Sequence, residues 1–400
     1  MKTPKFLSLK SEKARRGLVV ALTLALFALC SVFYFLEIGK DSSDDSVKIK
    51  ISQILSDEYF LTKGYGDDEV LTREYVFLGE ILEGERKGSS IKAYFTLDEL
   101  SQLSSYELKP GDKMLAQIIL DENGEEIAYA QDFVRDKGIY LLASIFILSL
   151  IAFGGGQGAK TALSLGISCF FIFFLFIPLL IKGYSPVGLS FLTSGVIIFL
   201  TLYLVMGRTT KTIASAFGCI GGLGCGFILA FVMQKLLHLT GIVNEESAYL
   251  IFNSPNGYLN LKGIVLAQAI IGALGAVMDV SVSVSSSLFE LTEKSPKISP
   301  RELFKSGINI GRDIMGTMAN TLVLAYVGSS LQGLLLIYLS NMGLREAMNR
   351  EMLGTEILLA VCGSMGLLLT IPMTAFASAF IFKKKKEREL LRLCQEDKGE

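Results

Sequence analysis

The sequence predicts an α-helical integral membrane bundle of about eight transmembrane helices, with a small extracytoplasmic all-β domain, an OB-like barrel, inserted between helices 1 and 2. Three observations support this fold class. Apolar residues make up 51% of the 400 residues, including 26 Phe, and the mean hydropathy is positive. Both values exceed those of ordinary soluble chains. Long apolar runs fill most of the chain, and one long polar region interrupts them.

Eight apolar runs are candidate spans, because each approaches the roughly 20 residues that cross the hydrocarbon. They lie near residues 17–37, 138–153, 162–181, 187–206, 212–234, 260–280, 314–339 and 354–382. The run at 138–153 is the shortest, and we expect neighbouring small residues and helix tilt to complete it. The first run is too long for a signal peptide, and FLEIGKDSS after it lacks a cleavage site, so we expect a retained anchor.

Clusters of lysine and arginine predict the orientation, because short cytoplasmic loops carry an excess of these residues. The clusters are the tail before the first run, GRTTK at 207–211, the segment 294–312 and KKKKER at 383–388. Threading the runs alternately from an inside N-terminus places all four clusters on the cytoplasmic side. We therefore expect both termini in the cytoplasm.

This threading divides the chain into four parts. Residues 1–37 are a cytoplasmic basic tail and a transmembrane anchor helix, 38–136 an acidic extracytoplasmic β domain, 137–382 a seven-helix membrane domain, and 383–400 a charged cytoplasmic tail. In the β domain 22 Asp and Glu oppose 11 Lys and Arg. Such a surface either attracts cations and basic envelope components or serves only to keep the domain soluble.

Alternating residues in VKIKI at 47–51, and β-rich runs near 75–82, 90–95, 113–120 and 126–133, predict five short strands. Thr96 and Glu99 have the spacing of a capping box, which predicts one short helix between the third and fourth strands. A closed barrel fits this pattern, because closure removes exposed strand edges. The domain lacks the aromatic and basic stripe of a nucleic-acid site, so an envelope component is the expected partner.

Small residues at intervals of four predict close helix packing in two of the spans. Gly218, Gly222 and Gly226 form such a stripe in FGCIGGLGCGF, and Gly272 with Ala276 continues the pattern in the next span. Two interpretations stay open. The helices either slide or rock against each other during transport, or they simply pack.

Two motifs that resemble functional sites are rejected. GGGQGAKT at 154–161 looks like a phosphate-binding loop, but Ala159 replaces the glycine before the lysine, and an apolar span precedes the loop. We expect a cytoplasmic turn there. The lone histidine, His238, has no companion at ligand spacing, and the six cysteines suggest neither a disulfide scaffold nor a zinc site. No metal, cofactor or catalytic residue is assigned.

A polar run follows the sixth candidate span, in GAVMDVSVSVSSSLFEL at 275–291. The threading places Asp279 near the cytoplasmic end of that span. The serines then either continue the helix or accompany a break, because hydroxyls can satisfy backbone groups freed by unwinding. Helical continuation would group Ser283, Ser286 and Ser287 on one side, whereas the alternation of serine and valine fits an extended or broken segment equally well.

A second polar stripe lies across the next cytoplasmic loop. Ser299, Pro300 and Glu302 have the pattern of a capping box with proline at the first helical position, so a helix should start at about 300. Its polar stripe consists of Asn309, Arg312, Asp313, Thr317 and Asn320. Asp279 can meet Arg312 and Asp313 between the two helices. The cluster is then either an ion or substrate pathway, or a salt bridge that fixes helix register.

These two segments, GALGAVMDVSVSVSSSLFEL and SGINIGRDIMGTMANTLVLAYVG, carry a resemblance. The chain resembles the YibE/F-like family of bacterial membrane proteins, from the β domain to the last span. The resemblance implies a multi-pass protein of the bacterial plasma membrane. It implies no substrate and no catalytic residue.

Three classes of function remain open. The first is a secondary transporter or channel-like permease for a small solute or ion, with the polar site between helices 6 and 7. The second is a non-transporting envelope scaffold or sensor whose acidic outer domain binds a partner. The third is an intramembrane aspartyl protease, which is disfavoured because GAVMD is not a Gly-x-Gly-Asp motif, and no enzymatic activity is expected. Expected partners are the lipid bilayer and either a second copy of the chain or a related membrane subunit.

Overall fold

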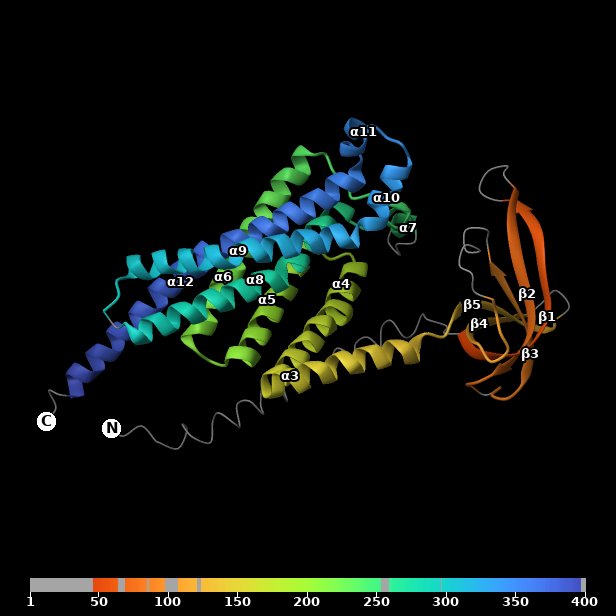
Figure 1. The fold of residues 1–400 in the computed structure, drawn as a ribbon, viewed down its shortest axis with the longest axis horizontal. Helices are drawn as coiled ribbons and strands as arrows, with labels where there is room; N and C mark the ends of the chain where they lie inside the picture. The colour runs from red at the N-terminus through yellow and green to blue at the C-terminus, as the bar shows by residue number, and fades with distance from the viewer. Residues whose placement is uncertain are drawn as a thin grey trace. The chain divides into compact units, whose positions relative to one another are not determined.

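The computed structural model describes residues 46–63, 69–84, 86–97, 107–120, 124–252, 259–295 and 297–396. The first predicted span and the predicted short helix after Thr96 lie outside these residues. Contacts between Cα atoms divide the chain into two compact units (Figure 1). Within the described residues, one unit comprises residues 46–152 and the other comprises residues 153–396.

Five strands of the first unit form a closed barrel within the described residues. They are β1 (Ser46–Lys63), β2 (Glu69–Ile81), β3 (Ser90–Leu97), β4 (Lys113–Leu120) and β5 (Glu126–Phe133). The strand order is β1-β2-β3-β5-β4, closed by antiparallel pairing of β1 with β4, and β3 pairs with β5 in parallel. The prediction of five strands is confirmed.

Alternation along the strands builds the barrel core. Ile91, Ala93 and Phe95 of β3 point inward at every second position, as do Met114 and Ala116 of β4. This is the period that places successive side chains on opposite faces of a sheet. The barrel therefore has a hydrophobic core of its own.

β1 is much longer than the five residues that its alternation predicted. Beyond residue 50, where its pairing with β4 ends, β1 continues along β2 in an antiparallel pair, here called the β1–β2 ribbon, on which Leu55, Tyr59 and Leu61 are exposed. Most side chains of β1 in this ribbon are exposed, so no alternation of apolar and polar residues marks this part of the strand in the sequence. One ion pair joins the two strands, because Arg73 of β2 donates two hydrogen bonds of 2.7 Å to the Asp57 carboxylate of β1.

The remaining elements are helical. They are α3 (Asp136–Phe171), the π-helix η2 (Ile172–Phe176), α4 (Ile177–Ile181), α5 (Pro186–Met206), α6 (Thr210–Leu236), α7 (Glu245–Phe252), α8 (Leu261–Lys294), α9 (Pro300–Ser329), α10 (Leu331–Leu339), α11 (Leu344–Met348) and α12 (Glu351–Glu396). Polar caps begin several of them. The predicted start at 300 is confirmed, because Ser299 and Glu302 form both bonds of a capping box.

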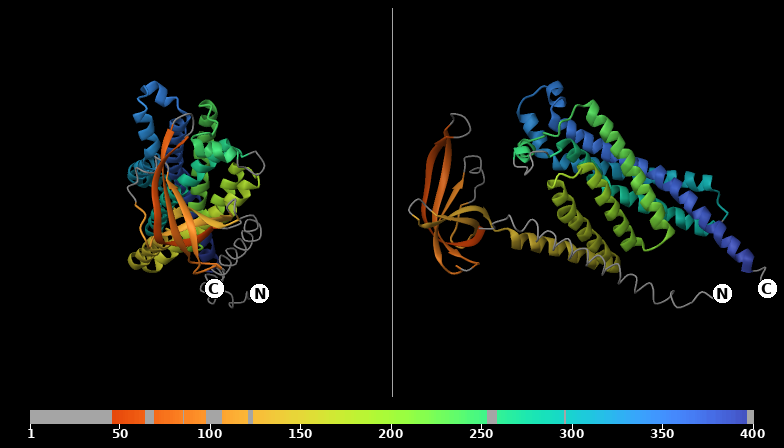
Figure 2. Two further views of the ribbon diagram at one scale, coloured as in Figure 1. Left: turned by 90° about the vertical axis from the view of Figure 1, so that its right-hand side faces the viewer. Right: turned by 180° about the vertical axis from the view of Figure 1, so that it is seen from behind.

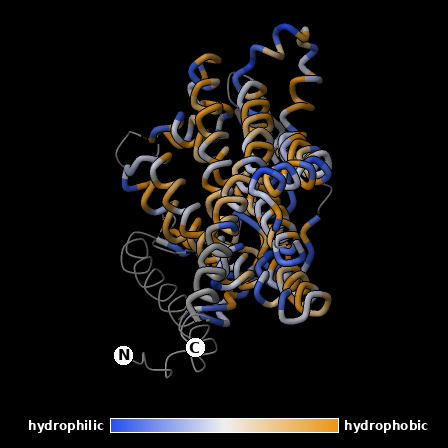
Figure 3. Tube along the Cα trace, turned by 90° about the vertical axis from the view of Figure 1, so that its left-hand side faces the viewer, coloured by the Kyte–Doolittle hydropathy of each residue, from blue (hydrophilic) through white to orange (hydrophobic). Residues whose placement is uncertain are grey.

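Five helical segments among the described residues are long and apolar enough to cross a membrane (Figure 3). They are Asp136–Ile181, Pro186–Met206, Thr210–Leu236, Leu261–Lys294 and Glu351–Lys383. Counting α9 and α10 as one span bent by 59° gives a sixth. The predicted count of eight is not reached, because the first run is not described and the runs at 138–153 and 162–181 share one segment. Gly155 interrupts that segment with non-helical backbone angles (φ 52°, ψ −131°).

α12 is the central helix of the bundle, and it packs along α6, α8 and α9 (Figures 1 and 2). α8 also contacts α5, α6 and α9. Of the two alternatives left open for the serines, the structure shows the continuous helix, because α8 runs unbroken for 34 residues. Because the helix is continuous, the serines do not compensate for unwound backbone. The inward serines instead form hydrogen bonds to neighbouring helices. The polar sequence run is therefore a helix with two differently used faces.

Candidate functional site

A cluster of buried hydroxyl groups lies where α6, α8 and α12 meet. Ser215 of α6, Ser281 and Ser285 of α8, and Thr374 of α12 are almost fully buried. The Oγ atoms of Ser215 and Ser285 are 2.5 Å apart, and Ser281 Oγ donates to the Ser215 carbonyl oxygen at 2.8 Å. Ser281 Oγ also lies 2.8 Å from Thr374 Oγ1. These bonds join three helices, and such interhelical bonds are typical of membrane bundles.

The glycine stripe of α6 permits this close approach. Gly218, Gly222 and Gly226 are buried and face α12, and Gly226 lies against the backbone of Gly366. A Cβ atom at Gly222 would lie 2.8 Å from the Gly366 carbonyl oxygen and closer still to the Thr370 hydroxyl. No larger side chain fits there without movement of α12.

The small residues of α8 do not join that interface. Gly272 lies beside the hydroxyl group of Tyr326 on α9, and Ala276 is half-buried at the edge of the main core. The structure thus places Gly272 at the contact with α9, whereas the glycine stripe of α6 packs on α12.

The outward face of α8 carries the polar residues singled out in the sequence. Asp279 and Ser287 are exposed, and Ser283 and Ser286 are half-buried. Their spacing of four, seven and eight residues from Asp279 places them on one side of the helix. Ser281 and Ser285 point to the opposite side, into the hydroxyl cluster. Among the described residues, Asp279 forms no ion pair.

The polar stripe of α9 also faces outward. Asn309, Arg312, Asp313, Thr317 and Asn320 are all exposed. The buried side of α9 is formed instead by Leu303, Gly307 and Gly311. Within the described part of the chain no ion pair joins Asp279, Arg312 and Asp313. The structure therefore brings the serines and Asp279 onto one face, and the α9 residues onto another, without pairing their charges.

Sequence reasoning missed the inward hydroxyl groups of α12. Thr370, Thr374 and Ser378 are fully buried and recur at intervals of four within the last apolar run. That spacing places them on one helix face, and this sequence pattern could have identified them. Ser215 carries no comparable pattern in α6.

Two carboxylates at the start of α12 were also missed. Glu351 accepts hydrogen bonds from the backbone N–H groups of Thr240 (2.5 Å) and Gly241 (2.6 Å), so it fixes the segment after α6. Glu356, one turn further along, lines a cavity beside Tyr326. Glu356 could have been singled out from the sequence, because it is a carboxylate inside an apolar run, as Asp279 is.

The described residues contain no group of three His, Cys, Asp or Glu side chains that could hold a metal ion. A comparison with protein families gives a match to the family described as YibE/F-like protein, over residues 142–384. The matched region contains both polar faces and the hydroxyl cluster. Neither the curated proteins nor the solved structures give a match.

Proposed function

The chain belongs to the YibE/F-like family, and from this premise we propose that it is a permease of the bacterial plasma membrane, which moves a small solute or ion along the polar faces of α8 and α9. Its apolar helices make it a membrane protein. Catalysis is not part of the proposal.

The observation that carries the proposal is the unpaired carboxylate of Asp279. It is exposed on a 34-residue apolar helix and has no ion pair among the described residues. A charged side chain in hydrocarbon costs about 2.5 to 3.5 kcal/mol on insertion scales. Asp279 is therefore expected to face water or a bound cation, both of which a transport pathway provides.

The exposed side of α9 supports the same conclusion. Arg312, Asp313 and Asn320 occupy an outer face of the bundle, where contact with lipid is unfavourable. We propose that a second copy of the chain covers this face and encloses the pathway. Arg312 and Asp313 carry opposite charges at adjacent positions, so two copies related by a two-fold axis can pair them reciprocally.

In the proposed topology Gly155 divides the segment Asp136–Ile181 into two crossings. Together with the bent span α9–α10 and the first apolar run, this gives eight spans. Both termini are then cytoplasmic, and the barrel lies outside. A cysteine at Ser89 of the barrel should react with an impermeant thiol reagent in intact cells. A cysteine at Gly156 should react only after permeabilisation. Reaction at Gly156 in intact cells would show that α3 does not turn back at the inner side.

Uptake by purified, reconstituted protein tests the transport proposal. Vesicles would be screened with protons, metal cations and small organic ions. Asp279→Asn should abolish saturable uptake and leave the thermal melting temperature unchanged. Glu290→Gln is the matched control, because Glu290 is an exposed carboxylate further along the same helix, and it should retain uptake. Normal uptake by Asp279→Asn would refute the assigned pathway.

A second candidate function is that of an envelope scaffold or sensor, in which the barrel binds a partner. The exposed apolar residues of the β1–β2 ribbon favour it, because long unpaired edge strands readily accept another strand. The strand order also agrees with an OB-type barrel, an architecture that often binds extended ligands. This candidate would be favoured if no tested ion were taken up and if replacing Tyr59 and Leu61 by serine abolished the binding of a partner to the barrel.

A further inference from the structure

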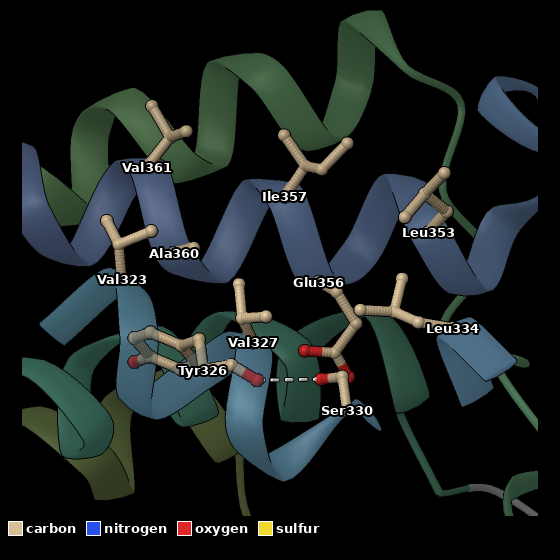
Figure 4. A pocket seen from close by; sticks show the side chains of 10 residues that line it. All are labelled: Val323, Tyr326, Val327, Ser330, Leu334, Leu353, Glu356, Ile357, Ala360 and Val361. Atoms are coloured by element: carbon tan, nitrogen blue, oxygen red, sulfur yellow. Dashed lines mark hydrogen bonds between the residues drawn. The ribbon is translucent and has the colours of Figure 1, made fainter. Parts of the chain in front are cut away.

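A small cavity lies where α9 bends into α10 and packs on the first turns of α12 (Figure 4). Its volume is about 200 Å³. Its walls are almost entirely apolar, with Val323 and Val327 from α9, Leu334 from α10, and Leu353, Ile357 and Val361 from α12. The cavity is separate from the polar faces of α8 and α9, so a ligand in it would be independent of the proposed transport pathway.

One ionisable side chain, that of Glu356, lines the edge of this apolar space. Figure 4 shows the carboxylate of Glu356 directed toward Ser330 at the junction of α9 and α10. The Ser330 hydroxyl donates its hydrogen to the carbonyl oxygen of Tyr326 at 3.0 Å, so it offers no proton to Glu356. Arg350, the nearest basic residue in the sequence, pairs with Glu346 at 3.5 Å. Among the described residues Glu356 has no ion pair or hydrogen bond.

Tyr326 provides the second distinctive group. Its ring forms part of the wall, and its hydroxyl oxygen is buried without a hydrogen-bond partner among the described residues. An aromatic face near an unpaired carboxylate is a favourable environment for a cation, because the ring quadrupole attracts positive charge. A carboxylate without a partner beside an apolar surface is costly in a membrane protein, and a bound cation would remove that cost.

From these groups we propose that the cavity binds a small organic cation: a protonated amine on a compact apolar body. The ammonium group would pair with Glu356, and the body would fill the apolar space beside Tyr326. The size agrees, since a cavity of about 150 Å³ holds benzene and this one is somewhat larger. An anion is excluded by the carboxylate, and a neutral apolar molecule would leave Glu356 unpaired.

Thermal melting of the purified full-length protein in detergent tests the site. The probes are benzylammonium, the neutral benzyl alcohol and the anionic benzoate. Benzylammonium should raise the melting temperature in a saturable manner, because a ligand that binds only the native state stabilises it. The other two probes should have no such effect.

Variants locate the effect. Glu356→Gln should weaken the apparent affinity for benzylammonium about tenfold or more, because a charge-assisted bond is lost. Glu290→Gln, which changes an exposed carboxylate on α8 away from the cavity, should leave the affinity unchanged. Ala360→Leu, which fills the cavity while retaining Glu356, should also abolish binding, and it serves if the glutamine variant fails to fold. Equal stabilisation by benzyl alcohol, or unchanged binding in either cavity variant, would overturn the proposal.

Discussion

Ser281 and Asp279 are two residues apart on α8, and the helix directs them to opposite sides. Ser281 bonds to α6 and α12, whereas Asp279 is exposed. The alternating serines and valines in the sequence fit a helix and an extended segment equally well. Helical spacing grouped Ser283, Ser286 and Ser287 on one side, which in the structure is also the side of Asp279. It could not show that the other serines face inward, because that depends on where α6 and α12 pack.

The two serine faces predict different effects of substitution. Ser281→Ala should lower the free energy of unfolding by about 0.6 to 1.7 kcal/mol, which are the average and the maximum found for interhelical hydrogen bonds in a membrane bundle. Ser287→Ala, on the exposed side of the same helix, should leave it unchanged. Melting of both variants in detergent measures the difference. A larger loss for Ser287→Ala would mean that the outward face, and not the hydroxyl cluster, holds the bundle together.

The ion pair on the β1–β2 ribbon makes the barrel sensitive to acid. The Arg73 guanidinium hydrogen-bonded to Asp57 holds the pKa of that carboxyl below its usual range. Because the folded-state pKa is lowered, the pair stabilises the barrel above the unfolded-state pKa of about 3.9, and this contribution is lost as pH falls through the folded value. Its size is about 1 kcal/mol or less, since the pair is partly exposed.

Residues 42–134, expressed alone, provide the measurement, because the barrel has its own core. The fragment should melt cooperatively and give a β-rich circular dichroism spectrum. Asp57→Asn should lower the melting temperature of the fragment at pH 7. The variant should also lose less stability than the parent fragment when the pH falls from 5 to 2. Glu80→Gln, an exposed carboxylate on β2, should do neither. An Asp57→Asn fragment as acid-sensitive as the parent would contradict this assignment.

At the scale of elements, local patterns were sufficient where one face of an element is buried. The strands β2 to β5, the capped start of α9 and the glycine stripe of α6 all follow from periodicity or capping chemistry. The pattern failed for the ribbon half of β1, because most of its side chains are exposed. It also failed for the bend between α9 and α10, where Leu331 continues the apolar run and the nearby Gly328 was not interpreted as a break at Ser330.

The contact between α6 and α12 predicts a sharp contrast between two glycines of one helix. Gly222→Ala should destabilise the protein by about 1 to 3 kcal/mol, because its Cβ would collide with Thr370 and the Gly366 carbonyl. Gly224→Ala should be neutral or slightly stabilising, since no atom lies within 4 Å of a Cβ there. Thermal melting and abundance in the membrane report both effects.

A third variant tests whether steric contact with Thr370 causes the loss of stability in Gly222→Ala. Thr370→Gly removes the hydroxyl group and the Cβ atom that face Gly222, and it should recover part of the stability lost in Gly222→Ala. If the two changes are simply additive, contact with Thr370 is not the source of the loss.

At the scale of the whole molecule, the sequence predicted a membrane bundle from composition and run length, and a separate barrel from the alternation and spacing of its strands. It could not predict which faces of the bundle are left uncovered, because that is a property of packing. On α9 the uncovered positions include Arg312, Asp313, Gly316, Thr317 and Asn320, a set of polar and small residues. In soluble proteins such a face would meet water, but in a bilayer it calls for another protein surface.

A second copy on this face can be detected by cross-linking. In a chain whose six native cysteines are replaced by alanine, Thr317→Cys should form a disulfide-linked dimer on oxidation in the membrane. Two parallel α9 helices packed through small residues bring equivalent positions near the axis within the Cα separation of about 4.4 to 6.8 Å that a disulfide needs. Phe199→Cys on α5, exposed on another helix, should remain monomeric.

Charge exchange then tests how the two copies meet. Arg312→Asp should reduce the cross-linking through Thr317→Cys, because each dimer would bring like charges together at the same depth. Adding Asp313→Arg restores one positive and one negative charge per copy, and cross-linking should return. If the single and double charge variants cross-link equally well, the ion pairs do not orient the dimer. If Thr317→Cys and Phe199→Cys cross-link to the same extent, the contact is collisional and α9 must be covered by something other than a second copy.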